Sequence, residues 1–162
     1  MRFRPAALLA LLLLPLPAAA NCIPPWETHF ACDIPARDAR AEFCRIADTK
    51  AHPGLKEGYY SYVTGTAPAE LYFQTDEIWF STKDYILDHP TDTTTAMGYR
   101  RGDYIYAFFL TEDTRESDGI RDADVRVYTS PDEFSSSTPD TEILRLHCAP
   151  STIRANLGLI AP

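Results

Sequence analysis

The sequence is poor in basic residues and, beyond its first twenty residues, has no long hydrophobic run. Its 162 residues include 15 Lys and Arg against 23 Asp and Glu, a formal net charge of −8. An acidic surface repels phosphate backbones and anionic lipid heads, so we expect no nucleic-acid binding, whereas a cationic partner is favoured. A membrane-spanning helix needs about 20 apolar residues. No later segment approaches that length, so no membrane span is expected.

The motifs that would identify an enzyme are also missing. The sequence contains no Gly-x-Ser-x-Gly nucleophile elbow. Its four cysteines form an even set, which leaves no spare thiolate for nucleophilic catalysis. Acidic pairs are numerous, but any acidic protein contains many by chance, and no spacing singles one out. We therefore expect no catalytic residue and no cofactor.

Two histidines lie close to cysteines in the sequence but do not predict a metal site. His29 is near Cys32, and His147 is next to Cys148. A disulfide between these cysteines would bring the histidines near each other on the sheet. Two histidines do not complete a zinc site, however, and the thiols would already be oxidised. We expect both to be surface histidines and predict no metal ligand.

Two further patterns are explained by turns. The acidic segment 113–124 fails as an EF-hand loop: with Gly119 at the sixth position, Thr114 and Val125 fall at the first and twelfth, where acidic ligands are required. We interpret it as a solvated hairpin loop. The tripeptide 101–103, Arg-Gly-Asp, matches a cell-adhesion motif, but Gly-Asp is also ordinary turn chemistry between two strands.

The first twenty residues have the order of parts of a secretory signal peptide. Arg2 and Arg4 give a positive start, residues 6–14 are continuously apolar, and residues 18–20 are three alanines. We predict cleavage after Ala20. Residues 21–162 then form one domain with 13 basic and 23 acidic residues, a balance of −10. Lipid attachment at Cys22 is disfavoured, because the residue before it is Asn21 rather than a small one.

Beyond residue 28, short aromatic and β-branched segments alternate with proline and glycine turns. This pattern predicts an all-β fold, a small antiparallel barrel or sandwich of eight to nine short strands. Segment 131–141 is expected to be a surface loop, and a short C-terminal helical turn should begin at Ser151 and close at Gly158. Segment 104–110 is apolar on both faces, so we expect a central strand. The predicted strands are 29–34, 41–46, 59–64, 70–74, 78–81, 95–100, 104–112, 125–129 and 143–148.

Four cysteines in a small exported domain predict two disulfides. Cys32 is in phase with apolar Phe30, and Cys148 with apolar neighbours, so both should face inward. Cys44 should face outward, where the N-terminal tail can present Cys22. We predict Cys32–Cys148 and Cys22–Cys44. The alternative, Cys32–Cys44 with Cys22–Cys148, stays open.

An aromatic cluster offers a possible ligand platform. Aromatic residues on strands are more often core residues or cross-strand pairs, and we interpret these mainly as core, with a carbohydrate platform as the alternative. The cluster comprises Tyr59, Tyr60, Tyr62, Tyr72, Phe73, Trp79 and Phe80.

Short motifs occur in order over nearly the whole domain. They are 30–32 (Phe-Ala-Cys), 43–44 (Phe-Cys), 60–65 (Tyr-Ser-Tyr-Val-Thr-Gly), 69–73 (Ala-Glu-Leu-Tyr-Phe), 104–108 (Tyr-Ile-Tyr-Ala-Phe), 125–127 (Val-Arg-Val) and 144–148 (Leu-Arg-Leu-His-Cys). This ordered pattern resembles a widespread group of small exported bacterial proteins that carry four cysteines and have no assigned activity, and the resemblance implies fold and compartment only. A more distant similarity is to the periplasmic inhibitors of C-type lysozyme, but their Ser-Gly-x-x-Tyr loop has no counterpart.

We therefore expect a periplasmic or secreted bacterial protein that acts as a non-enzymatic binding or interaction module. Its acidic loops would dock a cationic envelope or host protein, with electrostatic attraction speeding the encounter. Three alternatives remain: inhibition of lysozyme or another wall-cleaving enzyme, an enzyme acting on the envelope, and a small-ligand carrier. A carrier would need an internal cavity.

Overall fold

The computed structural model describes residues 22–83, 92–113, 121–135 and 141–156. The predicted signal peptide lies outside these ranges, and so does most of the acidic segment after residue 113. No helix within the described ranges is long and apolar enough to cross a membrane.

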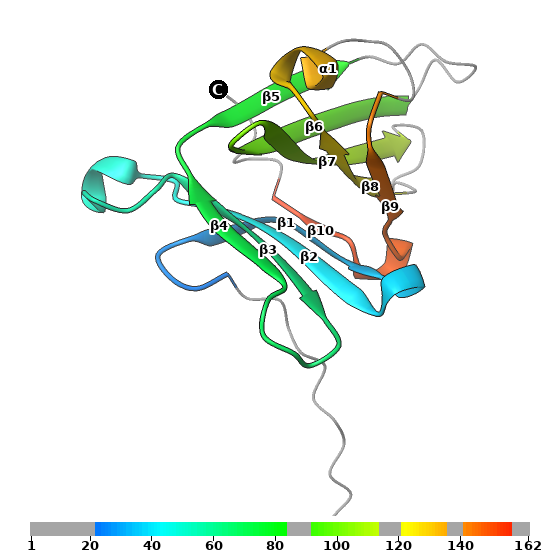
Figure 1. Ribbon diagram of the computed structural model, residues 1–162, viewed down its shortest axis with the longest axis horizontal. Coiled ribbons are helices and arrows are strands. Elements are labelled where there is room, and N and C mark those ends of the chain that lie inside the picture. The colour runs from blue at the N-terminus through cyan, green and yellow to red at the C-terminus, as the bar shows by residue number, and fades with distance from the viewer. Residues whose placement is uncertain (1–21, 84–91, 114–120, 136–140, 157–162) are drawn as a thin grey trace, which may run out of the picture.

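Ten antiparallel strands form two five-stranded sheets that face each other as a sandwich (Figure 1). The first sheet has the order β10-β1-β2-β3-β4 and the second the order β5-β6-β7-β8-β9. The all-β prediction is confirmed: all nine predicted strands are present, and β10 is added. The strands are β1 (Glu27–Ile34), β2 (Ala39–Arg45), β3 (Gly58–Thr64), β4 (Leu71–Thr75), β5 (Ile78–Lys83), β6 (Asp92–Arg101), β7 (Tyr104–Asp113), β8 (Arg121–Tyr128), β9 (Leu144–His147) and β10 (Arg154–Ala155).

The centre of the sandwich is filled by aromatic side chains. Phe30 stacks on Phe108 with ring centroids 4.4 Å apart, and Phe43 meets both Phe108 and Tyr99 edge-on at 5.3 Å. All four side chains are fully buried. We call Phe30, Phe43, Tyr99 and Phe108 the packed interior. Burying a large apolar side chain contributes about 1.5–3 kcal/mol, so this group is a main source of the fold's stability.

Strand β7 lies in the middle of the second sheet, as its two apolar faces predict. Phe108 on its inner face belongs to the packed interior. Phe109 on its outer face contacts Phe134 of helix α1 (Pro131–Ser135), with ring centroids 6.1 Å apart. The prediction of a surface loop from residue 131 is therefore wrong for α1. Proline and acidic residues suit the first helical turn, and burial of Phe134 holds the short helix on the sheet.

The C-terminal helical turn is present but shorter than predicted. The 3₁₀ turn η3 covers Pro150–Thr152, and β10 begins two residues later. Strand β10 pairs with β1, and the amide of Asn156 donates to the carbonyl of His29 at 2.9 Å. The edge of β1 needs hydrogen-bond partners, and this tertiary requirement overrides the local helical signal. Two other 3₁₀ turns are η1 (Pro35–Arg37) and η2 (Thr49–Ala51).

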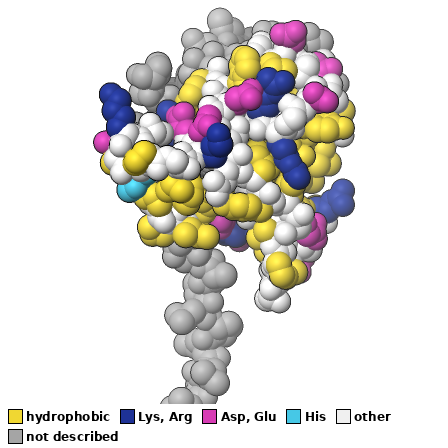
Figure 2. All heavy atoms as spheres, turned by 60° about the vertical axis from the view of Figure 1, so that its left-hand side comes forward, with side chains coloured by type: hydrophobic (Ala, Val, Ile, Leu, Met, Phe, Trp, Pro, Cys, Tyr) yellow, Lys and Arg dark blue, Asp and Glu magenta, His cyan; other side chains and the backbone are white. Residues whose placement is uncertain are grey.

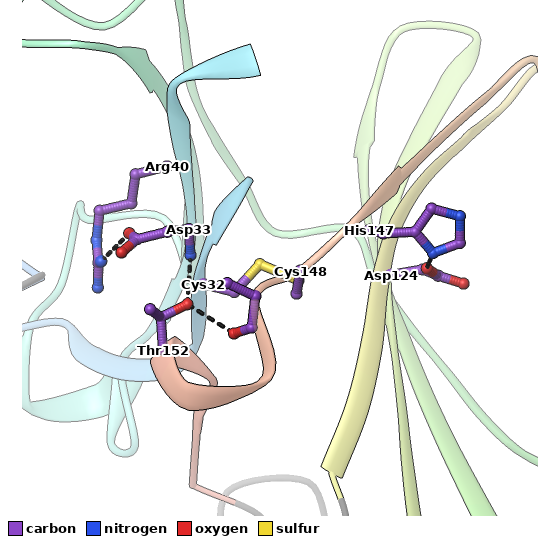
Figure 3. The surroundings of a disulfide bond; sticks show 8 residues. Cys32, Asp33, Arg40, Asp124, His147, Cys148 and Thr152 are labelled. Carbon is purple, nitrogen blue, oxygen red and sulfur yellow. Dashed lines mark hydrogen bonds and ion pairs between the residues drawn. A yellow bond between two sulfur atoms is a disulfide. The ribbon is translucent and has the colours of Figure 1, made fainter. Parts of the chain in front are cut away.

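Both predicted disulfides are confirmed. Cys32–Cys148 joins β1 of the first sheet to the end of β9 in the second, as Figure 3 shows. Next to it, the hydroxyl of Thr152 accepts from the amide of Asp33 at 2.9 Å, which fixes η3 against β1. Cys22–Cys44 lies on the other face of the first sheet, buried beside Tyr59 and packed against the partly buried Trp26. Strand phase was therefore a sound guide to the pairing.

Candidate functional site

A cleft of about 220 Å³ opens between the two sheets, beside the packed interior. Strands β3 and β4 form one wall, and β7, β8 and β9 form the other. Cross-strand registers fix the wall residues: Tyr62 lies opposite Leu71, and Val127 lies opposite both Tyr106 and Leu144. The cleft is lined by Arg37, Tyr60, Tyr62, Glu70, Leu71, Tyr106, Val125, Val127, Leu144 and Leu146.

Tyrosine rings form the inner part of this cleft. Tyr60 of β3 and Tyr106 of β7 stack across the two sheets, with ring centroids 5.2 Å apart and an angle of 28° between their planes. Phe73 contacts both rings, at 5.6 and 5.2 Å. These contacts fix the rings in place, so the aromatic surface of the cleft is formed in advance of any ligand.

Tyr60 supplies a hydroxyl group to the cleft. The residue is only 2% exposed, and its hydroxyl has no hydrogen-bond partner among the described residues, but this oxygen is not fully buried. Burial of the ring raises the pKa of Tyr60 above its usual value, so the phenol stays protonated. Burial also raises the pKa of Tyr62. Both side chains therefore offer neutral hydroxyls that can donate to a bound acceptor.

Two opposite charges line the cleft. Arg37 is the last residue of turn η1, and Glu70 immediately precedes β4. Both side chains are exposed, and neither forms an ion pair with a described residue. Both act on the Tyr62 phenol: after burial, Arg37 is the next largest influence on its pKa and lowers it, while Glu70 raises it. The cleft therefore combines apolar walls with one cation and one anion that have no partner in the described chain.

A second hollow, of about 350 Å³, surrounds turn η1. Two of its three charged lining residues are paired with each other: Arg40 contacts Asp33 at 2.5 Å, and it also contacts Glu42 at 3.1 Å. It is lined by Asp33, Ile34, Pro35, Asp38, Ala39, Arg40 and Gly65. Although this hollow is larger, fewer of its charged lining residues are available to a ligand than in the cleft.

His147 and Asp124 form a close pair on the outer face of the second sheet. They lie opposite each other on β9 and β8, with His147 Nδ1 2.6 Å from Asp124 Oδ1, as Figure 3 shows. The other carboxylate oxygen of Asp124 lies 2.8 Å from Arg126, whose guanidinium stacks over Phe109 at 4.1 Å. His147 is a surface histidine, as predicted. Arg126 also balances the buried carboxylate, so the arrangement is explained as a charge network.

His29 is buried, and its prediction as a surface histidine is wrong. A β-bulge between Thr28 and Phe30 interrupts the register of β1, and the imidazole packs edge-on against Phe108 at 5.9 Å. Neither ring nitrogen has a hydrogen-bond partner in the described chain. Burial, followed by the positive charge of Arg45, lowers the pKa of His29 to about 3. A bulge shifts side-chain phase by one residue, and strand alternation cannot predict that.

The predicted aromatic cluster divides into three parts. Tyr60, Phe73 and Tyr62 contribute to the interior and the cleft, and Tyr59 is buried on the outer face beside Cys22–Cys44. The others, Tyr72, Trp79 and Phe80, are exposed. The core interpretation is therefore confirmed for part of the cluster only.

The Arg-Gly-Asp tripeptide and the acidic segment have ordinary structural roles where the structure describes them. Residues 101–103 make the tight turn between β6 and β7, where Gly102 has a φ of 60° that favours glycine. Segment 113–124 begins at the last residue of β7, and its residues 114–120 lie outside the described chain. Residues 121–124 belong to β8, where Ala123 and Asp124 are buried, so the prediction of a solvated loop is wrong for this part. Within the described ranges, no group of three or more His, Cys, Asp or Glu side chains could hold a metal ion.

Among the cleft residues, the sequence singled out Tyr60 and Tyr62 as part of a possible ligand platform. Arg37 carried no motif, and Glu70 lay in the motif 69–73 without marking a site. Both belong to the first sheet: Ala39, two residues after Arg37, lies opposite Thr64, and the Glu70 amide donates to the Tyr62 carbonyl at 2.9 Å. The facing wall is supplied by the second sheet, and strand patterns do not specify how the two sheets meet.

Comparison with family models, with curated proteins and with solved structures finds no match for this chain. The resemblances to exported four-cysteine proteins and to lysozyme inhibitors therefore remain predictions, and the chemistry of the cleft rests on its own residues.

Proposed function

We propose that this protein is a non-enzymatic binding module of the bacterial cell envelope, and that it binds its ligand in the cleft between the sheets. The observation that carries the proposal is the meeting of an apolar, ring-lined cleft with Arg37 and Glu70, which have no ion-pair partner in the described chain. The Tyr60 hydroxyl also has no hydrogen-bond partner there, although it is not fully buried. A ligand that packs on the rings and accepts a hydrogen bond from Tyr60 would find complementary groups in this cleft.

The size of the cleft limits what it can hold. A volume of about 220 Å³ corresponds to roughly seven waters at about 30 Å³ each. Sites for drug-sized ligands are larger, about 300–1,000 Å³. The cleft therefore suits one ring or one branched apolar group. That group would belong either to a small molecule or to the side chain of a larger partner.

Binding fits this cleft better than catalysis does. Glu70 is the single carboxylate among its lining residues, whereas acid–base chemistry by paired carboxylates needs two with different environments. A small-ligand carrier is the second candidate, because the cleft supplies the kind of cavity that a carrier requires.

The expected steering by acidic loops has less support. On the face shown in Figure 2, basic and acidic side chains are interspersed rather than separated. A cationic partner remains favoured by the net charge of −8. Export is supported by the two disulfides, which are typical of oxidising compartments.

Capture from envelope extract, with a blocked cleft as control, tests the proposal. Leu144→Trp places a large ring at the cleft, whereas Ile143→Trp alters a neighbouring, more exposed residue that does not line it. We expect the oxidised domain and its Ile143→Trp variant to retain the same component at low salt, and Leu144→Trp to lose it. Retention by Leu144→Trp at the level of the wild type would contradict binding in the cleft.

A further inference from the structure

We propose that the cleft recognises a small zwitterion, specifically a free α-amino acid with an aromatic or branched apolar side chain. This inference rests on the proposed function, because it names the ligand class of the same cleft. Three features that occur together carry it: an apolar pit with fixed tyrosine rings, an arginine and a glutamate with no ion-pair partner in the described chain, and a tyrosine hydroxyl that likewise has no partner there.

The apolar pit would hold the side chain of the amino acid. Val125 and Leu146 are buried in its wall, and the stacked rings of Tyr60 and Tyr106 present aromatic surface. An aromatic side chain would find partners for offset or edge contacts there. The volume of about 220 Å³ leaves no room for a much larger apolar group.

Arg37 and Glu70 would bind the two charged ends. A guanidinium forms strong, directional hydrogen bonds with a carboxylate, and a carboxylate accepts from an ammonium group. Neither residue has an ion-pair partner in the described chain, and both act electrostatically on the same Tyr62 phenol. Tyr62 therefore lies within reach of both charges, and a compact ligand with both signs of charge would complement them.

Tyr60 would supply a neutral donor. Its protonated hydroxyl lines the cleft and could donate to a carboxylate oxygen of the ligand. A ligand with only one charge would leave Arg37 or Glu70 without a partner. A neutral sugar would leave both without one.

The test compares three probes that share one ring. Phenylalanine carries both charges, 3-phenylpropionate lacks the ammonium group and phenethylamine lacks the carboxylate. Two-dimensional NMR of the oxidised protein would follow each titration to tens of millimolar. At the binding efficiency per atom that is ordinary for small ligands, we expect phenylalanine to bind with a Kd of about 1 mM. Exposed ion pairs contribute little, so each probe that lacks one charge should bind about two- to fivefold more weakly.

Variants that remove one charge from the cleft show which residue binds the carboxylate and which binds the ammonium group of the ligand. Arg37→Gln should remove the advantage of phenylalanine over phenethylamine, and Glu70→Gln should remove its advantage over phenylpropionate. Arg154→Gln and Glu27→Gln change exposed residues that do not line the cleft and should leave all three affinities unchanged.

The outcomes separate this inference from the proposed function. If the single-charge probes perturb cleft residues as strongly as phenylalanine does, the cleft binds a ring but does not select a zwitterion, and only this inference is wrong. The same holds if Arg37→Gln and Glu70→Gln weaken all three probes equally. If no probe perturbs the cleft while blocking it still abolishes envelope capture, the ligand belongs to another class. If blocking the cleft has no effect on capture either, the proposed function fails as well.

Discussion

Two buried tyrosines on the inner faces of the sheets differ in one respect. Tyr99, in the packed interior, donates its hydroxyl to the carbonyl of Cys44 at 3.1 Å. It also lies so close to Gly58 that a Cβ there would be 2.8 Å from its ring. Tyr60, in the cleft, has no hydrogen-bond partner in the described chain. The Tyr99 hydroxyl is therefore used by the packed interior, whereas the Tyr60 hydroxyl is available to a ligand. This contrast holds for the two tyrosines and not for every polar group, because the ring nitrogens of His29 beside Phe108 also have no partner in the described chain.

The largest expected effect on stability concerns the disulfide that joins the two sheets. Cys32 and Cys148 are 116 residues apart, so replacing both with alanine should lower the free energy of unfolding by about 5 kcal/mol on the chain-entropy model. Cys22 and Cys44 are 22 residues apart, and their double alanine variant should lose about 3 kcal/mol. Urea denaturation measures both. An equal or larger loss for the outer pair would mean that the inter-sheet link is not the main constraint.

Two residues on the inner face of β7 compare the regions directly. Phe108 is fully buried in the packed interior, whereas Tyr106 is half-buried at the cleft. Phe108→Ala should cost about 3–5 kcal/mol, through lost burial and the cavity left behind. Tyr106→Ala should cost less than half as much, because solvent already reaches that site. Similar costs in urea denaturation would show that the cleft is packed as firmly as the centre.

The buried His29, which packs against Phe108 of the packed interior, makes the free energy of unfolding depend on pH. The pKa of His29 is about 3 in the fold and about 6.5 in an unfolded chain. Below pH 6.5 the unfolded state therefore binds a proton that the folded state does not, and the stability contributed by neutral His29 declines as the pH falls toward 3. The slope approaches about 1.4 kcal/mol per pH unit well below pH 6.5, and the loss between pH 6.5 and 4.5 amounts to about 2.3 kcal/mol.

Matched variants isolate this effect. His29→Phe should flatten the pH dependence of stability by that amount, because the ring stays and the titrating nitrogens are removed. His147→Gln, at the exposed histidine paired with Asp124, is the matched control for the loss of an imidazole. If His147→Gln flattened the curve and His29→Phe did not, the buried imidazole would not be the group responsible.

Local alternation along the strands predicted most of the fold, whereas the way in which the two sheets meet left little signal in the sequence. Strand phase identified Cys32 as inward and Cys44 as outward, and this was enough to choose the disulfides. It failed at His29, where a bulge shifts the phase, and at Phe134, which is apolar within a segment of turn-forming residues. The cleft was missed for a different reason. Its charges come from a turn and a hairpin connection of the first sheet that carry no recognisable signal, and its other wall is supplied by the second sheet.

The smallest expected effect tests the contrast between Tyr99 and Tyr60. Tyr99→Phe removes a buried hydrogen bond and should cost about 1 kcal/mol. Tyr60→Phe removes a hydroxyl that has no partner in the described chain, so its free energy of unfolding should change by less than about 0.5 kcal/mol. Equilibrium denaturation at pH 7 would measure both, with the same ring retained in each variant. The same Tyr60→Phe protein should bind phenylalanine more weakly than the wild type, since the hydroxyl is the proposed donor to the ligand. A clear loss of stability in Tyr60→Phe would show that the fold already uses this hydroxyl, and the distinction between the two regions would then fail at its central residue.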